Sequence, residues 1–390
     1  MTNARQPSIA PDPRWRDCAL FAALELSGTS WLIAVSAPCE DKVSKRTIAA
    51  GRGSDLVELL GDLQARAERR VGAPVPVVTI HEAALDGFWL HRLLVARGLH
   101  SHVVVPASIA VDRRKRRRKT DAIDVDALLR TVMAWARGER GVCSMVRPPS
   151  PEEEDRRRIC REGEELLCER IRHTNRIKGL LAGQGVVDFR PLRMADQARL
   201  DDLVTGDGRP LPLRLKAELQ RQVERLRSVQ RDLETVEAER DAMISHGDAA
   251  EAGGRPGLLM RLKGVGAEIA SVLWLEALFR DFADRRQVAA YAGLAPGPWQ
   301  SGGTSRDQGI SRAGNPRLRR MMIQLSWLWV RHQPASVISR WFATRVGTAR
   351  GRVHRIAIVA VARKLLVAPW RFVLQGVVPE GAIFKAPASA

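Results

Sequence analysis

The sequence predicts an α/β domain followed by an all-α region, and three observations support this fold class. Over residues 18–146, short apolar runs typical of strands alternate with amphipathic helical segments. Residues 151–250 form long polar segments with helical spacing, which predicts a helical coiled-coil region. Residues 256–376 form an Arg-rich helical domain with long apolar stretches. The chain of 390 residues is therefore expected to contain three domains.

The first predicted domain begins with a strand meander. Residues 18–26 and 31–38 are apolar runs joined by Ser-Gly-Thr-Ser, which is typical of a hairpin, and a third strand is expected near 44–50. Ser54 and Thr120 are expected to cap helices. The remaining strands and helices are expected at 75–82, 102–107, 54–70, 85–97 and 120–136. A meander followed by alternating helix and strand predicts a mixed sheet with helices on its faces.

The rest of the chain is predicted to be helical. A linker at 147–151 precedes mixed-charge helices at 152–185 and 212–246. The second helix has a coiled-coil spacing, so it is expected to pair either with the first helix or with a second copy. Its apolar positions are Leu219, Val223, Leu226, Val229, Leu233 and Val236. In the last domain, the apolar segment 356–374 is expected to be a buried helix that Pro369 ends or bends.

Composition and charge favour some classes of protein and partner and exclude others. The chain has 63 Lys+Arg against 44 Asp+Glu, a formal net charge of +19, which favours nucleic acid as the partner. A hydrophobic content of 45% excludes disorder as the main state. No apolar run is long enough to span a bilayer and the N-terminus lacks an apolar leader, so a cytosolic protein is expected. The five cysteines have no CxxC spacing and are expected to be buried, reduced thiols.

Four acidic residues of the first domain are candidate metal ligands. Glu25 lies near the end of the first strand, and Glu82 ends the fourth. Asp121 and Asp124 lie three apart on one helix face. A glutamate inside the apolar run LFAALEL indicates function because burying an unpaired carboxylate is costly. Carboxylates gathered at one sheet edge repel each other, and divalent cations, Mg²⁺ or Mn²⁺, remove that repulsion. Each acid taken alone is more simply explained as a surface charge.

A run of seven cations stands directly before Asp121. The run consists of Arg113, Arg114, Lys115, Arg116, Arg117, Arg118 and Lys119. Like charges repel along such a block, so we expect a loop that lies on a nucleic-acid backbone beside the acids. A localisation tag or a solvated loop is the alternative.

The last domain holds a candidate nucleophile and further cations. Ser301 stands in a Gly- and Pro-rich loop that would present its hydroxyl, and guanidinium groups would stabilise the charge that develops on an attacked phosphate. The arginines expected to bind phosphate are Arg306, Arg312, Arg317, Arg319 and Arg320. A helix-hairpin-helix-like turn at 262–266 adds Lys263 and two glycines. The alternative interpretation is a loop serine beside arginines that only bind phosphate.

The order of these features resembles the insertion-sequence-110 group of transposases. The resemblance covers residues 18–376. It rests on the segments HEAALDGFWLHRLL, KTDAIDVDALLR and RLKGVGAEIASVL, and on GLAPGPWQSGG followed by GISRAGNPRLRR. The KTDxxD element and the last pair of segments are each fairly specific, and their occurrence in this order is a strong signal.

The resemblance implies a RuvC-like, RNase H-type domain at 18–146, a coiled-coil insert and a C-terminal transposase domain with a serine nucleophile. Its Asp-Glu-Asp-Asp tetrad matches Glu25, Glu82, Asp121 and Asp124, and its serine matches Ser301. Glu25 stands where the family pattern has Asp, so the extra methylene changes the ligand geometry there. The implied partners are element ends and target DNA, an element-encoded structured guide RNA, and further copies of the chain in a dimer or tetramer. The implied location is the bacterial cytosol, at the nucleoid.

The resulting hypothesis is a Mg²⁺-dependent DNA transposase that forms a phosphoserine intermediate at Ser301. One alternative is a RuvC-like metal-dependent nuclease that uses water. Another is an inactive nucleic-acid-binding remnant, for which Glu25 and Pro369 would be signs of decay. A tyrosine recombinase is disfavoured because the only tyrosine, Tyr291, lies in an apolar stretch.

Overall fold

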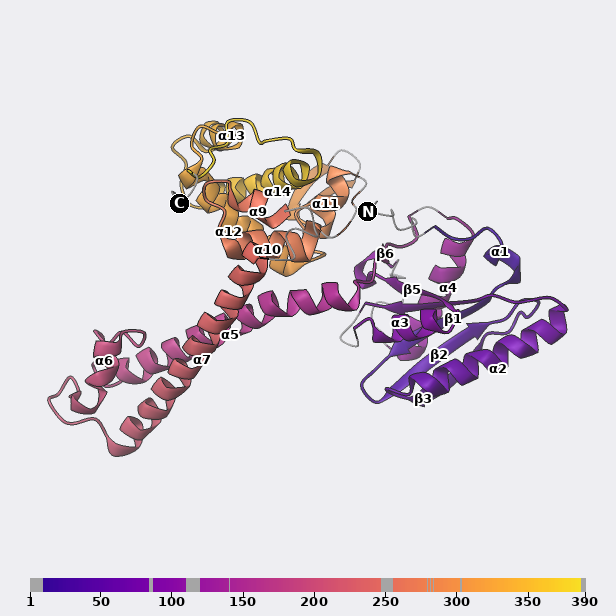
Figure 1. Ribbon diagram of the computed structural model, residues 1–390, viewed down its shortest axis with the longest axis horizontal. Helices are drawn as coiled ribbons and strands as arrows, with labels where there is room; N and C mark the ends of the chain where they lie inside the picture. Colours follow the sequence, from indigo (N-terminus) through magenta and orange to yellow (C-terminus); the bar gives the residue numbers. More distant parts are fainter. Residues whose placement is uncertain are drawn as a thin grey trace. The chain divides into compact units, whose positions relative to one another are not determined.

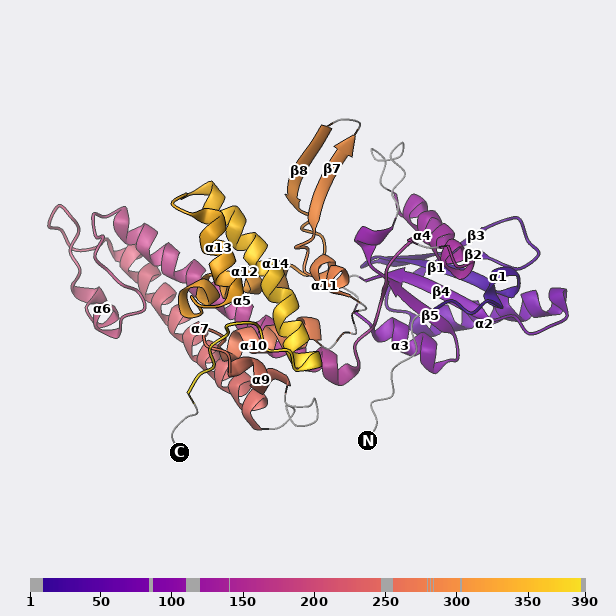
Figure 2. The same cartoon turned by 90° about the horizontal axis from the view of Figure 1, so that it is seen from above.

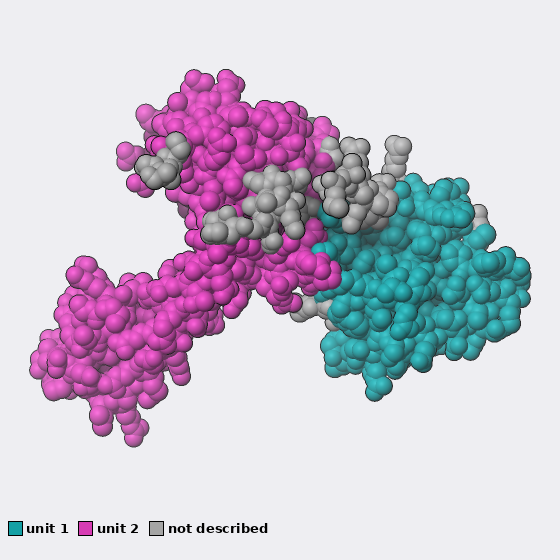
Figure 3. Space-filling view, in the orientation of Figure 1, with its two compact units in different colours: residues 1–150 teal, residues 151–390 magenta. Residues whose placement is uncertain are grey.

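The computed structural model describes two compact units, Met1–Ser150 and Pro151–Ala390 (Figure 3). Their boundary falls within the linker predicted from adjacent prolines. The described residues are 10–83, 87–109, 120–139, 141–246, 255–278, 280, 282, 284–301 and 304–386.

The first unit is built on a mixed sheet of six strands in the order β3-β2-β1-β4-β5-β6 (Figure 1). The strands are β1 (Leu20–Leu26), β2 (Ser30–Ser36), β3 (Ser44–Ala49), β4 (Val77–Glu82), β5 (His100–Val104) and β6 (Met145–Val146). β1 is antiparallel to β2 and parallel to β4, and β4 is parallel to β5. The predicted mixed sheet is confirmed, and its strand order is consistent with an RNase H-like domain. β6 was not predicted because two residues carry no pattern.

Helices cover both faces of this sheet (Figure 2). The even-numbered residues of β1, such as Leu24, pack with α2 (Gly53–Val71) and α3 (Trp89–Ala96). The odd-numbered residues, such as Ala23, pack with α4 (Asp121–Ala136). Strand alternation therefore decides which side chains meet α4. Two short helices, α1 (Trp15–Cys18) and the 3₁₀ turn Pro106–Ser108, complete the unit.

The two predicted helix caps are wrong in detail. α2 begins at Gly53, so Ser54 lies inside its first turn. A Cβ at Gly53 would approach Leu93 Cδ2 to 2.6 Å, so the glycine lets α2 start close against α3. Thr120 does occupy the cap position of α4, but its side chain forms no capping hydrogen bond.

The second unit begins with a long antiparallel helix pair, α5 (Pro151–Ala182) and α7 (Leu213–His246) (Figure 1). All six predicted apolar positions of α7 are buried. The coiled-coil spacing is therefore satisfied by pairing within the chain. α6 (Met194–Ala198) and the 3₁₀ turn Leu200–Asp202 lie in the connection between the two helices.

The remainder of the second unit is helical apart from one hairpin. Its elements are α9 (Arg255–Met260), α10 (Ala267–Leu273), the π-helical turn η4 (Trp274–Leu278), α11 (Arg285–Tyr291), β7 (Pro296–Ser301), β8 (Thr304–Ile310), α12 (Pro316–His332), α13 (Val337–Val346) and α14 (Arg352–Gln375). α14 is the predicted apolar helix, but it continues through Pro369 to Gln375. Of the two expected effects of Pro369, an end of the helix is excluded, because Pro369 and its neighbour Trp370 are buried and core packing outweighs the lost hydrogen bond.

Two expectations from composition can be compared with the structure. Among the described residues, no helix has the length and apolar character needed to cross a membrane. All five cysteines are free thiols. The expected burial is wrong for Cys18, Cys39 and Cys168, which are exposed because they lie at a helix end, in a loop and on the polar surface of α5. Cys143 and Cys160 are half-buried.

One histidine of the first unit, His81, is buried, and a second, His102, is half-buried. His81 on β4 is 1% exposed, and neither of its ring nitrogens has a hydrogen-bond partner in the described part of the chain. Burial lowers its pKa to about 4, with a smaller contribution from nearby His91. Burial likewise lowers the pKa of His102 to about 4, assisted by His91 and His100. Both imidazoles are therefore neutral in the folded protein.

Acidification is expected to destabilise the first unit. In the unfolded chain these imidazoles take up a proton near pH 6.5, whereas burial holds the folded-state pKa of His81 and His102 at about 4. The unfolded state therefore binds more protons between these values, and the free energy of unfolding falls as the pH drops through this window, by up to about 3 kcal/mol per histidine. Hydrogen exchange of the β4 and β5 amides measures this loss.

His81→Leu supplies the control. Leucine fills an apolar site without titrating, so the variant, which keeps His102, is expected to lose about half as much stability as the wild type between pH 6.5 and 4. An equal loss in both proteins would contradict a role for this histidine.

Candidate active site

Two strand ends place Glu25 and Glu82 side by side. β1 and β4 are parallel and pair along their lengths, and the next pair after the last recorded one is Glu25 and Glu82. Both glutamates lie on the face of the sheet on which Ala23 and Ile80 pack with α4. Both are half-buried. The carboxyl edge of the sheet therefore carries two adjacent carboxylates on its α4 face.

The N-terminus of α4 lies over the same edge. Trp15, just before β1, has its ring centroid 4.8 Å from that of His100, the first residue of β5, and 6.0 Å from that of Trp135 near the end of α4. The end of α4 is thus at the amino edge of the parallel strands, and the helix runs antiparallel to them. Its first turn, which carries Asp121 and Asp124, is at the carboxyl edge.

The two aspartates continue the packing stripe of α4. Asp121 is one turn before buried Val125, and Asp124 is one turn before buried Leu128. Asp121 is exposed and Asp124 is half-buried. Asp126 leaves this stripe, because its carboxylate pairs with Lys45 Nζ of β3 at 2.8 Å.

The four carboxylates share an edge and a face, and their chemistry suits a hard divalent cation. Magnesium prefers oxygen ligands and is commonly bound through one or two carboxylates with water completing its shell. Among the described residues, however, no three His, Cys, Asp or Glu side chains form a group that could hold a metal ion. The fold supplies the right residues at one edge without a ready-made cage. The basic run at 113–119, expected beside them, lies outside the described residues.

Ser301 is the last residue of β7, and its backbone pairs with Thr304, the first residue of β8. Residues 296–310, expected to form a loop, are instead an antiparallel hairpin with an irregular register between Pro296 and Pro298. The sequence hid these strands because glycine and proline are depleted in strands. The side chains of Ser301 and Arg306 lie outside the described part of the chain.

Backbone hydrogen bonds close the base of this hairpin. Ser311 N–H donates to the Ala295 carbonyl at 2.8 Å, and Asn315 N–H donates to the Tyr291 carbonyl at 2.7 Å. The backbone passes so closely here that a Cβ at Gly314 would lie 2.3 Å from the Tyr291 oxygen, and Gly314 also has φ +99°. Only glycine fits at this position.

A buried carboxylate, Glu276, also holds the base of the hairpin in place. Glu276 lies on η4 and is 2% exposed. Asn315 Nδ2 donates to Glu276 Oε2 at 2.9 Å, while Asn315 Oδ1 accepts from the backbone N–H of Arg317 and Leu318 and so caps α12. Arg161 of α5 lies 3.4 Å from the same carboxylate. Such pairing is what a buried charge requires.

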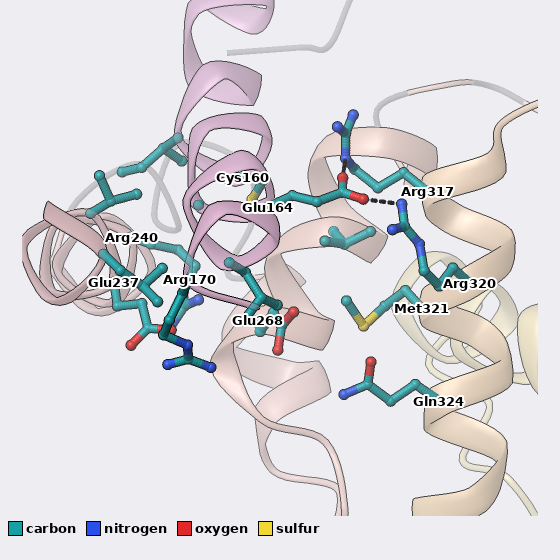
Figure 4. A pocket seen from close by; sticks show the side chains of 16 residues that line it. Cys160, Glu164, Arg170, Glu237, Arg240, Glu268, Arg317, Arg320, Met321 and Gln324 are labelled. Carbon is teal, nitrogen blue, oxygen red and sulfur yellow. Dashed lines mark hydrogen bonds and ion pairs between the residues drawn. The ribbon is translucent and has the colours of Figure 1, made fainter. Parts of the chain in front are cut away.

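Two arginines predicted to bind phosphate are paired with protein carboxylates. Arg317 and Arg320 both form ion pairs with Glu164 of α5 (Figure 4). Arg317 Nη1 also lies 3.5 Å from Glu276. Glu164, Arg317 and Arg320 line a pocket of ≈ 250 Å³ between α5, α7, α10 and α12. The Arg317 side chain is only 22% exposed, so phosphate would have to displace a carboxylate to reach it, whereas the Arg320 side chain is 61% exposed and keeps donors open to solvent.

The other predicted cations differ in their surroundings. The guanidinium group of Arg319 donates to the carbonyl oxygens of Ala292 at 3.2 Å and Arg312 at 2.9 Å, so it braces the hairpin base. Arg312 is exposed, at φ +58°. Lys263 is exposed in the turn between α9 and α10, where Gly264 has φ +90°, and Gln333 Nε2 donates to the Lys263 carbonyl. Arg312 and Lys263 are therefore open to solvent.

Comparison with known proteins gives the family. A family model described as "Transposase IS116/IS110/IS902 family" matches residues 257–340. The chain is 51% identical over 380 residues, 95% of each protein, to "Putative transposase y4rJ" of Sinorhizobium fredii. It is 30% identical over 204 residues to "Probable family 20 transposase" of Pseudomonas aeruginosa, covering 51% of this chain and 57% of that one. It is 25% identical over 262 residues to "Transposase for insertion sequence element IS1328" of Yersinia enterocolitica, covering 67% and 73%.

The chain belongs to the IS116/IS110/IS902 family of transposases. The resemblance drawn from its motifs is thereby confirmed, and the protein is an enzyme that acts on DNA. The matched residues of this transposase include the turn at 262–266, Glu276, the hairpin and α12.

Sequence reasoning missed Glu276. The signal that could have found it is the one that singled out Glu25, an acid within an apolar run, here VLWLEALF. Its partner Asn315 stands in the motif that carried the resemblance, but the motif does not show that Asn315 both caps a helix and binds a buried acid.

Asn315→Ala is expected to loosen α12 and the hairpin base of the transposase. The variant removes a helix cap and leaves Glu276 without one of its hydrogen bonds, a loss of about 2–4 kcal/mol. Asp284→Ala is the matched control, because Asp284 caps α11 from an exposed position and should cost only about 1 kcal/mol. Hydrogen exchange of the α12 and α11 amides measures both. Equal losses would show that the bond to Glu276 contributes nothing.

Proposed function

We propose that this transposase cuts and rejoins DNA through a covalent phosphoserine intermediate at Ser301, in a Mg²⁺-dependent reaction directed by a structured RNA of the element. In this proposal the chain has three functional parts: a RuvC-like domain at 18–146, a coiled-coil pair at 151–250 and a C-terminal transposase domain at 256–376. The observation that carries the proposal is the placement of four carboxylates at one edge and one face of an RNase H-like sheet. A hairpin whose first strand ends on Ser301 and whose base is fixed by hydrogen bonds supplies the nucleophile.

The reaction needs no nucleotide hydrolysis, because the number of phosphodiester bonds does not change. The Ser301 hydroxyl oxygen bonds to phosphorus as the bond from phosphorus to the leaving sugar oxygen breaks, and the hydroxyl proton ends on that oxygen. One phosphodiester replaces another, so a sugar hydroxyl can reverse the step and rejoin DNA to a new end. Exposed cations such as Arg312 and Lys263 would hold flanking phosphates.

Glu25, Glu82, Asp121 and Asp124 would hold the metal ion. Bound Mg²⁺, or Mn²⁺ in its place, supplies positive charge that polarises phosphate oxygens. These four residues are otherwise a concentration of negative charge at the place where a DNA backbone must approach. Glu25, with one methylene more than the Asp of the family pattern, reaches the same edge from β1.

Two other functions are consistent with the same family and fold. A RuvC-like nuclease would use water and would cleave without a protein–DNA bond. An inactive remnant would bind nucleic acid and cleave nothing. The variants below distinguish these alternatives.

The test is to trap a protein–DNA adduct on a denaturing gel with element ends, Mg²⁺ and the transcript that flanks the gene. Ser301→Ala is expected to lose the adduct by at least about 10³-fold, because no other group replaces the nucleophile. Asp121→Asn is expected to lower it about 100-fold or more by weakening metal binding. Omitting the transcript is expected to abolish it.

Matched controls come from neighbouring residues. Ser305→Ala alters another serine of the hairpin, and Asp126→Asn alters the acid that pairs with Lys45; both should retain the adduct within a few-fold. An adduct that persists in Ser301→Ala refutes the serine mechanism. Cleavage without an adduct identifies the water-dependent nuclease, and tight binding without cleavage identifies the remnant.

We also propose that the transposase forms a dimer or tetramer through the loop end of the α5–α7 pair. The apolar stripe of α7 is already buried by packing within the chain. Several large apolar side chains are nevertheless exposed near the connection: Val187, Leu192, Met194, Val204 and Leu213. Val187 and Leu213 are 86% and 83% exposed, an arrangement typical of an interaction surface.

Replacing Met194 and Leu213 together by Glu is expected to convert the oligomer to a monomer, as measured by light scattering after size-exclusion chromatography. Val43→Glu, which changes an exposed apolar residue of the first unit, should keep the wild-type mass. An unchanged oligomer in the double variant, or a monomeric wild type, would rule out this interface.

A further inference from the structure

Helices α12, α13 and α14 carry an unusual surface. Residues 316–375 contain twelve Lys and Arg and no Asp or Glu. The three helices pack together, and Figure 2 shows them side by side. Among their exposed cations, Arg331, Arg352 and Arg355 form no ion pair with any described residue. By contrast, α5 and α7 carry both signs of charge and pair with each other through Arg176 and Glu218. An excess of one charge that the protein leaves uncompensated indicates a polyanionic partner.

An aromatic pair stands within this surface. Trp327 is 44% exposed on the solvent stripe of α12, which also carries Gln324 and Arg331. Its indole stacks on the imidazole of His354 with centroids 5.1 Å apart and an interplanar angle of 28°. Phe342 of α13 meets the His354 ring edge-on at 5.0 Å and 81°. Residues from three helices therefore hold a flat aromatic group in place while leaving much of it open to solvent.

We propose that Trp327 and His354 form a stacking site for an unpaired base of a nucleic acid, with Arg331, Arg352 and Arg355 contacting the neighbouring phosphates. Aromatic platforms beside cations are the usual means of binding single strands, because every base has a π-face. In a duplex that face is covered by the next base pair, so only an unpaired base can stack here. The site requires neither Ser301 nor the acidic edge and so goes beyond the proposed reaction.

The charge of the surface argues against other occupants. A second copy of this surface would bring like charge against like charge and be repelled. The exposed apolar residues beside the platform, Val353 and Ile356, are flanked by Arg352 and Arg355 and form no wide apolar patch of the kind a protein partner needs. Single-stranded DNA and unpaired RNA share the base and the phosphate, and the assay separates them.

The experiment measures binding of the full chain to fluorescent 12-mers by anisotropy, with all probes compared at the same salt concentration and the measurement repeated over a series of salt concentrations. The probes are single-stranded DNA, single-stranded RNA, duplex DNA and a DNA strand whose central positions are abasic. Trp327→Leu is expected to weaken binding of DNA or RNA single strands by about 5- to 100-fold and to leave duplex and abasic DNA within twofold. Trp327→Phe should restore most of the affinity. The nucleic acid, DNA or RNA, whose single-stranded probe loses more affinity is identified as the natural ligand of the site.

Two controls keep the result specific. Trp89→Leu removes a tryptophan of similar exposure, 39%, that packs on Trp31 in the first unit, and it should not change binding. Arg331→Gln with Arg355→Gln should weaken all probes and reduce the salt dependence. Equal weakening of every probe by Trp327→Leu, no weakening of any, or a change of oligomeric mass in place of binding would overturn the proposal. Because no cleavage is measured, failure of the serine mechanism would not affect this result.

Discussion

The parallel register of β1 with β4 is the constraint on which the acidic edge depends. Side chains alternate along a strand, so a slip of one residue would turn Glu25 or Glu82 to the opposite face of the sheet. The register is set by apolar side chains on both faces, Leu24 toward α2 and α3 and Ala23 toward α4. Core packing thus fixes the position of the charged residues, and α4 then brings Asp121 and Asp124 to the same edge.

In the second unit, the candidate site is positioned by a polar interaction, the hydrogen bond between Asn315 and Glu276, and not by core packing as in the first unit. The base of the hairpin is fixed by backbone hydrogen bonds, by Gly314 and by the bond between Asn315 and buried Glu276. A buried carboxylate is unfavourable unless each oxygen is satisfied. The Glu276 side chain therefore couples three features: the cap of α12, the hairpin base and the contact with Arg161 of α5.

Much of the fold followed from periodicity, and the exceptions have physical causes. Apolar runs located the first five strands, and helical spacing located α5, α7 and α14. The hairpin was missed because glycine and proline break the strand pattern, and Pro369 did not end α14 because its surroundings are buried. Glu25 was singled out because it interrupts an apolar run. The partners of Arg317 could not be predicted, since Glu164 is 153 residues away in sequence and only the packing of α5 on α12 joins them.

The central claim is that Ser301 becomes covalently bound to DNA, and mapping the bond tests it most directly. Trypsin should release residues 287–306 as one peptide, which contains Ser301 together with Thr304 and Ser305. After nuclease digestion of a trapped complex, tandem mass spectrometry should find the nucleotide remnant on Ser301. A remnant on Thr304, on Ser305 or on any other peptide would contradict the claim.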